Sequence, residues 1–419
     1  MIENRYIIQE FKPDFEKKLQ NFENSFVTNK LLFGLIQVNR SYDKVTYEQY
    51  FNQKYGDGFI LLLLDRENNN QLVGKVLFGM KEVLVNNTTF IAAYIHEMRF
   101  GNSCNNNLAV QQKFIDYGLL KAAKQYQCQL AYLIFDQAKK SDFEDLFAKE
   151  LKFQKVGDIV SQISMQNNMI KPQDAIGEYL KFKEILPQEA FEFHKNQLNK
   201  KSEDFYCKEL FKSDQTKTFA FANQDNTDVY ALSVYFDDKR FSKNFSRFII
   251  SSKLLQNKLF IKIFYLLVNV VFATLLFLQK TEEGLLNDDL KYQTIIYLGL
   301  NVGICLAFYQ TQKAFQKFSG TVGRIFQPIE IEKMVQSQTK KREIYEALIR
   351  NIQGVCFQNK SSQIRIDIDT RGDHLDYFNQ KSCFTPYNEN NFSFYAASLN
   401  GENINFKDIK ILSVDPRDF

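Results

Sequence analysis

The chain has 419 residues, of which 45% are hydrophobic, so it can form two or three domains with substantial cores. Its formal net charge of +4 is close to balanced for this length, which argues against a nucleic-acid-binding surface. Six cysteines without a CxxC motif and only three histidines argue against a disulfide framework and a zinc site. We therefore expect neither a nucleic acid nor a metal as a partner.

The first third of the chain alternates the patterns of strands and helices. A short strand at 6–9 precedes an amphipathic helix, which has Pro13 in its first turn and an aromatic core face. Three strands follow at 58–65, 72–79 and 90–100, and Asn-rich turns join them. This order predicts a sheet with a helix packed against it.

A long helix and a buried strand continue this unit. The helix is expected at about 109–127 and the strand at 130–135. Ser141 is a predicted N-cap that opens a further helix, and two strands between residues 153 and 166 are expected to pair and close the unit. The first domain is therefore predicted to span residues 1–167.

This order of elements resembles the GNAT-type (GCN5-related) acyl-CoA N-acyltransferases. The resemblance is carried by YIHEMRF, which runs into a loop and a long helix, and by LFAKELKFQKVG, which is similar to the family ending FYxKLGFxxxG. It implies an α/β (α+β) fold, in which helices flank a mixed sheet. It also implies acyl transfer from coenzyme A as the activity of an intact member.

In that family, a loop of the form Arg/Gln-x-x-Gly-x-Gly/Ala holds the pyrophosphate of coenzyme A on backbone N–H groups. The loop here reads GNSCNNNLAVQQ, and the resemblance places Asn106, Ala109 and Gln111 at the three motif positions. The loop has no Arg or Lys, and Gln111 is expected to obstruct the phosphate because it replaces a glycine. We therefore expect no cofactor, and acetyl-CoA only if the chain is active.

The resemblance also implies positions for the catalytic groups. In the family, the general base is a Glu on the strand that corresponds to the one predicted here at 90–100, and Glu97 matches it. His96 is expected on the opposite face of that strand. A surface-facing carboxylate is the alternative interpretation of Glu97. The tyrosine that serves as the family's general acid corresponds to Ala148, and the Gly of the FYxKLGF ending corresponds to Lys152. Loss of the phosphate loop and of the tyrosine argues for an inactive acyltransferase fold.

The second soluble part begins after a predicted linker at 168–186. Residues 187–258 are assigned to the first part of a second α/β domain, with a strand hairpin at 218–222 and 229–236. Residues 310–419 form its remainder, with a helix at about 341–353 and strands at 362–369, 391–398 and 409–414. Because this order repeats that of the first domain, we expect a smaller and more degenerate GNAT-like half.

Between these two parts, residues 259–309 contain two long apolar segments separated by an acidic loop. Segments 259–278 and 292–309 could extend for ~30 and ~27 Å as helices, about the thickness of the hydrocarbon core of a bilayer. The sequence therefore predicts a transmembrane hairpin, with the lipid bilayer as a partner. The alternative is a pair of buried core helices, which Lys262, Asn269 and Asn301 keep open.

The flanks of the hairpin are basic and its loop is acidic, which predicts that both soluble domains lie on the same side of the membrane. Gly299 and Gly303, four residues apart, would permit close approach of another helix. The N-terminal residues match neither a secretory signal nor an amphipathic transit peptide. The mitochondrial inner membrane is the expected location, and the cytosolic face of another intracellular membrane is the alternative.

Three functional hypotheses follow from these patterns. The first is a catalytically silent, membrane-anchored accessory or structural subunit of a larger membrane complex, such as a mitochondrial respiratory assembly. The second is an active membrane-bound acyl-CoA-dependent N-acetyltransferase with Glu97 as its base. The third is a regulatory module that binds acyl-CoA without turnover.

Overall fold

The protein is described here from a computed structural model. The described residues are 5–26, 29–31, 36–41, 46–86, 88–137, 144–165, 175–176, 180–186, 188–190, 192, 204–207, 216–222, 229–236, 247–250, 296–297, 299, 320–322, 338–358, 363–371, 385–401, 404–409 and 411–413. The chain divides into two compact units, each described by itself below. The first contains Met1–Lys18, Val45–Asn244 and Phe318–Phe419, and the second contains Leu19–Lys44 and Phe245–Lys317.

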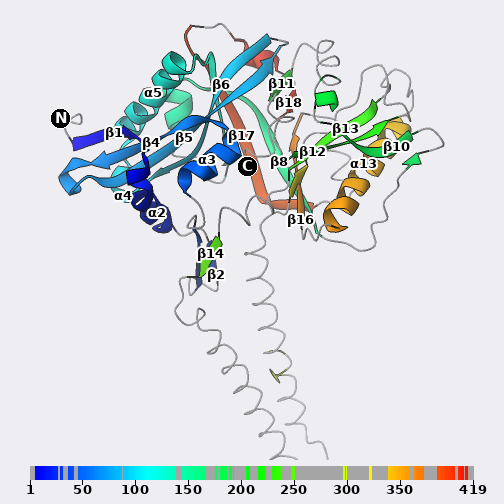
Figure 1. Ribbon diagram of the computed structural model, residues 1–419, viewed down its shortest axis with the longest axis horizontal. Coiled ribbons are helices and arrows are strands. Elements are labelled where there is room, and N and C mark those ends of the chain that lie inside the picture. The colour runs from blue at the N-terminus through cyan, green and yellow to red at the C-terminus, as the bar shows by residue number, and fades with distance from the viewer. Residues whose placement is uncertain are drawn as a thin grey trace, which may run out of the picture. The chain divides into compact units, whose positions relative to one another are not determined.

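The first unit contains one large mixed sheet that draws its strands from both ends of the chain (Figure 1). In spatial order its strands are β1 (Tyr6–Glu10), β4 (Asp57–Asp65), β5 (Gln71–Val85), β6 (Thr88–Phe100), β7 (Leu130–Asp136), β17 (Thr385–Ser398), β8 (Gln154–Met165), β16 (Gln363–Asp369), β15 (Gly320–Val322), β13 (Val229–Phe236), β12 (Thr216–Ala222), β10 (Leu180–Ile185) and β9 (Ala175–Ile176). Two short strands, β11 (Asp204–Cys207) and β18 (Ile411–Ser413), extend it beside β5. The predicted mixed sheet with flanking helices is thereby confirmed.

Helices cover both faces of the sheet formed by the N-terminal strands. Helix α5 (Leu108–Gln125) packs on one face, where a Cβ added to Gly118 would meet the ring of Phe78. Helix α3 (Tyr47–Tyr55) covers the other face, where a Cβ added to Gly79 would lie 3.3 Å from the side chain of Tyr55. Successive residues of β5 point to opposite faces, so the two helices pack against alternate residues of one strand.

Several local predictions in this region are confirmed. The aromatic-faced helix appears as α2 (Glu16–Asn24), which follows a 3-10 turn (Pro13–Phe15) that contains Pro13. Helix α5 and strands β4, β5, β6 and β7 lie where the sequence predicted them. Helix α3 was not predicted, although Thr46 and Gln49 form a capping box at its start, which is a recognisable sequence signature.

Strands β6 and β7 are parallel neighbours for only a short distance. Their register runs from Ala92 opposite Leu130 to Ile95 opposite Leu133. Beyond Ile95, β6 continues to pair with β5, whereas β7 continues to Asp136 paired with β17. The two strands therefore separate immediately before Glu97.

The strand pairing at the end of the first predicted domain differs from the prediction. The two strands expected between residues 153 and 166 are a single strand, β8, and its partner on the β7 side is β17 from near the C-terminus. Both β7 and β8 pair antiparallel with β17. A turn between consecutive strands was the simpler prediction, but the sheet gains the same hydrogen bonds from a strand more than 200 residues away in the sequence.

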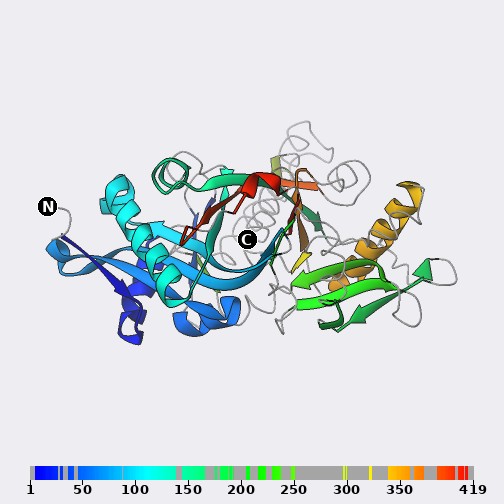
Figure 2. The same cartoon turned by 90° about the horizontal axis from the view of Figure 1, so that it is seen from above.

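The C-terminal strands repeat one arrangement of the N-terminal ones. The parallel neighbours β15 and β16 flank α13 (Gln338–Gln358) in the sequence, as the parallel neighbours β6 and β7 flank α5. Helix α13 packs on β12 and β13 (Figure 2). The side chains between them form an aliphatic and aromatic core. The predicted hairpin of β12 and β13 is confirmed, whereas part of the expected linker at 168–186 is strand β10, which pairs with β12.

The second unit contains a small antiparallel sheet in the order β14 (Arg247–Ile250), β3 (Ile36–Ser41) and β2 (Asn29–Leu31). Of the predicted hairpin at 259–309, only Ile296, Tyr297 and Gly299 are described, so the hairpin lies almost entirely outside the described residues. Among the described residues, no helix combines the length and apolarity needed to cross a membrane.

Candidate functional site

Glu97 lies at an irregularity in β6 where the strand begins to leave β7. The register with β5 shifts so that Glu97 and Met98 together lie opposite the single residue Val76. Such a bulge locally re-aims side chains. The φ of Glu97 is 46°, a left-handed value that non-glycine residues rarely adopt. The backbone at the candidate base is therefore held in a specific, strained geometry.

The carboxylate of Glu97 belongs to a buried three-residue cluster, which we call the Glu97 cluster. Its Oε2 lies 3.0 Å from Nζ of Lys75 on β5 and accepts a hydrogen bond of 2.9 Å from the hydroxyl of Tyr47 on α3. Lys75 also donates to the Tyr47 hydroxyl. The side chain of Lys75 is fully buried, and that of Glu97 is 18% exposed. A buried ammonium needs such a partner because an isolated charge is costly away from water.

His96 and Glu97 both contact helix α3, so the expectation that they lie on opposite faces is wrong. The His96 ring lies 3.7 Å, centroid to centroid, from that of Tyr55 and stacks with Phe51, while Glu97 contacts Tyr47. Tyr47, Phe51 and Tyr55 are spaced four residues apart and so share one face of α3. The bulge explains the difference, because an extra residue interrupts the strict alternation of a strand.

The loop between β6 and α5 folds into a short helical turn, α4 (Asn102–Asn105). The backbone N–H groups of Cys104 and Asn105 donate to the carbonyl of Gly101, at 2.9 and 3.0 Å. The N–H of Asn107 donates to the carbonyl of Cys104 at 3.1 Å. Several backbone donors of this loop therefore bond within the loop itself.

The three positions matched to the coenzyme A loop have different environments. Asn106 is exposed at the C-terminal end of α4, and Ala109 is exposed in the first turn of α5. Gln111 is only 2% exposed, and its Nε2 donates at 2.8 Å to the carbonyls of both Cys104 and Asn105. Gln111 thus fastens the loop to the helix, rather than projecting outward as an obstacle.

The position matched to the family's tyrosine is Ala148 in a π-helical segment (Asp145–Glu150), where Phe147 is buried in the core. A phenol reaches this region from another part of the chain. Tyr395 on β17 donates a hydrogen bond of 2.6 Å to Oε1 of Glu144, immediately before that segment. Burial, together with this bond, raises the pKa of Tyr395. Tyr395 therefore joins β17 to the segment at Glu144 through a structural contact.

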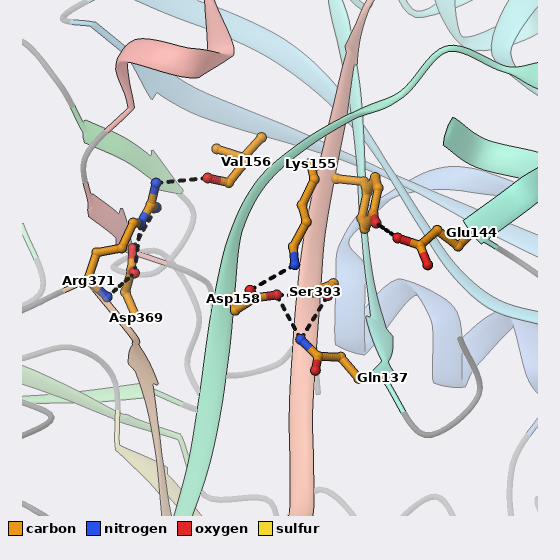
Figure 3. Close-up of polar contacts among 9 residues, drawn as sticks. Gln137, Glu144, Lys155, Val156, Asp158, Asp369, Arg371 and Ser393 are labelled. Carbon is orange, nitrogen blue, oxygen red and sulfur yellow. Dashed lines mark hydrogen bonds and ion pairs between the residues drawn. The ribbon is translucent and has the colours of Figure 1, made fainter. Parts of the chain in front are cut away.

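A second polar group, which we call the junction cluster, joins β7, β8 and β17. Figure 3 shows the side chains of Gln137, Lys155 and Ser393 directed at Asp158, with contacts of 2.7 to 2.8 Å. Burial alone would raise the pKa of Asp158, but hydrogen bonds from these three residues lower it overall. Lys155 lies on β8, Ser393 lies on β17 and Gln137 directly follows β7. Because β17 brings these segments together, we interpret the cluster as structural.

Arg371 makes a similar connection at the end of β16. Its guanidinium forms a bidentate pair with Asp369, at 3.0 and 2.8 Å, and donates to the carbonyl of Val156 (Figure 3). It also donates to the carbonyl of Ile409 at 2.7 Å. The N–H of Leu412 donates to the same Asp369 carboxylate at 2.7 Å. Bidentate charge-assisted bonds of this kind are among the stronger polar contacts in proteins. They fix the C-terminal segment to β8 and β16.

Of the two glycines predicted for helix packing, Gly303 lies outside the described residues. Gly299 is exposed, and a Cβ added there would meet no described atom within 4 Å. Within the described part of the chain, no group of three His, Cys, Asp or Glu side chains is arranged to hold a metal ion.

Lys75 and Tyr47 were missed by sequence reasoning. A signal for Lys75 existed, because a lysine in the middle of the apolar strand LVGKVLFG requires a buried partner. Tyr47 could have been found only after α3 had been recognised from its capping box and its aromatic spacing. Their proximity to Glu97 depends on the sheet register and on the position of α3.

Comparison with known proteins supports the fold. No protein-family model and no curated protein sequence matches the chain. Two solved structures of Saccharomyces cerevisiae N-myristoyltransferase with bound myristoyl-CoA, one of them also with inhibitors, match with TM-scores of 0.51 and 0.53 at 9% identity. They cover 97% and 98% of this chain and 83% and 87% of the matched chains. A GCN5-related N-acetyltransferase from Anabaena variabilis matches at a TM-score of 0.46 and 6% identity, over 94% of this chain and 72% of the other.

The likeness to the two N-myristoyltransferase structures supports a GNAT-type acyltransferase fold for this chain. At this level of identity the likeness concerns the fold alone, and function has to be argued from the site.

Proposed function

We propose that the chain is a non-catalytic, membrane-anchored accessory subunit of a larger membrane complex, built on a GNAT-type acyltransferase fold. The observation that carries this proposal is the hydrogen bonding of the loop between β6 and α5. In an intact acyltransferase of this family, that loop offers backbone N–H groups to the pyrophosphate of coenzyme A. Here the N–H groups of Cys104, Asn105 and Asn107 are used within the loop, which also has no basic side chain.

The environment of Glu97 supports the same proposal. A general base must accept a proton during the reaction. If Glu97 were protonated, the ammonium of Lys75, which is fully buried 3.0 Å away, would lose its counter-charge. The pair is therefore well suited to holding β5, β6 and α3 together and poorly suited to proton transfer.

Membrane anchoring and membership of a complex rest on the sequence. The apolar segments within residues 259–309 have the length of membrane spans, and basic residues flank them. We propose the mitochondrial inner membrane as the location, with both soluble parts on the matrix side. Resistance of the full chain to extraction with alkaline carbonate would support the anchor, and release without detergent would contradict it.

Ligand binding by the full chain tests the loss of catalysis. The full chain is required because β17 completes the sheet beside β7 and β8. Acetyl-CoA and myristoyl-CoA are each titrated to a concentration 1,000 times a reference Kd of about 1 µM. At that concentration, a ligand that binds with this Kd would add about 4 kcal/mol to the free energy of unfolding. We expect no change in Tm and no release of free coenzyme A thiol.

Two outcomes would overturn the proposal and separate its alternatives. If an acyl-CoA raises Tm but no thiol is released with any amine offered, the chain is an acyl-CoA-binding module. If thiol is released and Glu97→Gln abolishes the release while leaving Tm with acyl-CoA unchanged, the chain is an acyltransferase and Glu97 is its base.

The acyltransferase is the second candidate, and one observation favours it. Strands β6 and β7 separate just before Glu97, which leaves a carboxylate at the place where two parallel strands diverge. Leu108 and Ala109 lie in the first turn of α5, where backbone N–H groups have no intrahelical acceptor. An anionic ligand could contact these groups.

A further inference from the structure

Helix α5 carries an exposed apolar stripe in addition to its buried face. Its buried residues are Val110, Gln111, Phe114, Ile115, Gly118, Leu119 and Ala122. On the outer side, Tyr117 and Leu120 are 48% and 53% exposed. Leu108 is 42% exposed at the start of the helix, but it lies nine residues before Tyr117 and hence on the opposite side of the helix. Only two other large hydrophobic residues of the described chain are comparably exposed, Leu186 and Ile296. Tyr117 and Leu120 therefore form the exposed apolar stripe of α5.

Lysines border the stripe at both ends. Lys113, Tyr117, Leu120 and Lys124 are spaced four, three and four residues apart, which places them along one line of the helix surface. Both lysines are exposed. They lie eleven residues apart, which corresponds to about 16 Å along the axis. The surface thus consists of an aromatic and an aliphatic side chain between two positive charges.

A second copy of this chain does not fit this surface. In a two-fold symmetric contact with antiparallel helices, Lys113 would face Lys124 of the other copy. With parallel helices, each lysine would face its own equivalent. Both arrangements place like charges together around a small apolar centre, which disfavours self-association.

An anionic membrane surface also fits poorly. A helix that lies in a membrane interface buries a broad apolar face in the lipid. The broad apolar face of α5 is already buried against the sheet, and Asp116 adds a negative charge one turn before Leu120. Two large apolar side chains between lysines instead match the ridge of one protein element, with carboxylates on either side.

We infer that the outer face of α5 is a docking surface for another protein, which presents an apolar ridge bordered by two carboxylates about 16 Å apart. This inference deepens the proposed accessory role by assigning the surface through which the chain contacts a partner. Tyr117 and Leu120 supply the apolar centre, and Lys113 and Lys124 set the position of the partner along the helix.

Carbodiimide cross-linking tests this surface, because the reagent joins an amine to a carboxylate only when the two are in contact. The tagged full chain is expressed in the cells that make it, cross-linked in detergent extract, purified and mapped by mass spectrometry. We expect Lys113 and Lys124 to be joined to two carboxylates of one other protein. Leu120→Asp should reduce both cross-links at least about tenfold, as expected for a central contact. The control Leu186→Asp, the same change at another exposed leucine, should leave them unchanged.

Every other outcome overturns the inference. Absence of the paired cross-links, cross-links to a second copy, or cross-links that survive Leu120→Asp would each do so. Flotation with phosphatidylglycerol vesicles that is lost in Leu120→Asp would assign the surface to lipid instead. The proposed function is tested separately. Turnover of acyl-CoA would contradict the non-catalytic role, but it would not alter the cross-links at α5.

Discussion

The ammonium of Lys75 lies 3.0 Å from a carboxylate oxygen of Glu97, and both groups also contact the hydroxyl of Tyr47. Three elements, α3, β5 and β6, thus meet in one buried polar contact. Lys75→Met should lower the free energy of unfolding by about 3 kcal/mol, because it leaves the Glu97 carboxylate without its counter-charge. Urea denaturation of the full chain measures this change.

The double variant Lys75→Met/Glu97→Gln should recover much of that loss, because no uncompensated charge remains. The exposed pair of Lys149 and Asp145 provides a control, and Lys149→Met should change the free energy of unfolding by less than about 0.5 kcal/mol. Equal losses in the single and double variants would show that packing by the lysine stem, rather than its charge, is what matters.

Gly118 allows α5 to approach the sheet closely. Alanine is favoured over glycine inside a helix by about 1 kcal/mol. Its methyl group would, however, meet the ring of Phe78 and lie 3.1 Å from a methyl carbon of Leu61. We expect Gly118→Ala to be destabilising overall by about 1–2 kcal/mol, because overpacking of a filled core outweighs the helix preference. A rise in Tm would show that α5 can shift outward at little cost.

Phe394 on β17 is fully buried and stacks against Tyr132 on β7, with ring centroids 5.3 Å apart. Phe394→Ala should therefore lower the free energy of unfolding by about 3–5 kcal/mol. Amide hydrogen exchange should also become faster in β7, more than 200 residues away in the sequence. Asn391→Ala, at an exposed position of the same strand, is the control and should change neither quantity.

Asp65 at the end of β4 should make the free energy of unfolding depend on pH in a defined direction. The hydrogen bonds from Arg5, with a further bond from Asn68, lower the pKa of Asp65 below its ordinary value. Because the pKa of Asp65 is lower in the folded state, its ionised form stabilises the fold when the pH is above the unfolded-state pKa of 3.8. This stabilisation is lost as the pH falls from 3.8 through the folded-state pKa.

The wild type should therefore exceed Asp65→Asn in the free energy of unfolding by a constant amount above about pH 5. The difference should narrow as the pH falls below 3.8. Charge-assisted hydrogen bonds of this kind contribute about 1.5–3 kcal/mol, which bounds the expected plateau. Denaturant titrations between pH 2.5 and 7 measure it, and a gap that widens on acidification would contradict the assignment.

The sequence by itself determined the local elements with strong periodicity. The run FILLLL predicted β4, the aromatic and aliphatic spacing predicted α5, and the order of elements predicted a GNAT-type fold. Glu97 was placed on its strand, β6. Of the three residues matched to the loop, Asn106 lies there, whereas Ala109 and Gln111 lie in α5. The local elements were predicted correctly because alternation and helical spacing are set by neighbouring residues, which the sequence displays directly.

Only the tertiary structure decided which strands are neighbours and what surrounds each side chain. The partner of β7 and β8 is β17, a choice that depends on long-range strand pairing and that local patterns do not encode. The bulge at Glu97, which turns it and His96 towards α3, is likewise set by the register between β5 and β6. A carboxylate matched to a catalytic base by sequence thereby lies beside a buried lysine, and this contact exists only once the sheet and α3 have assembled.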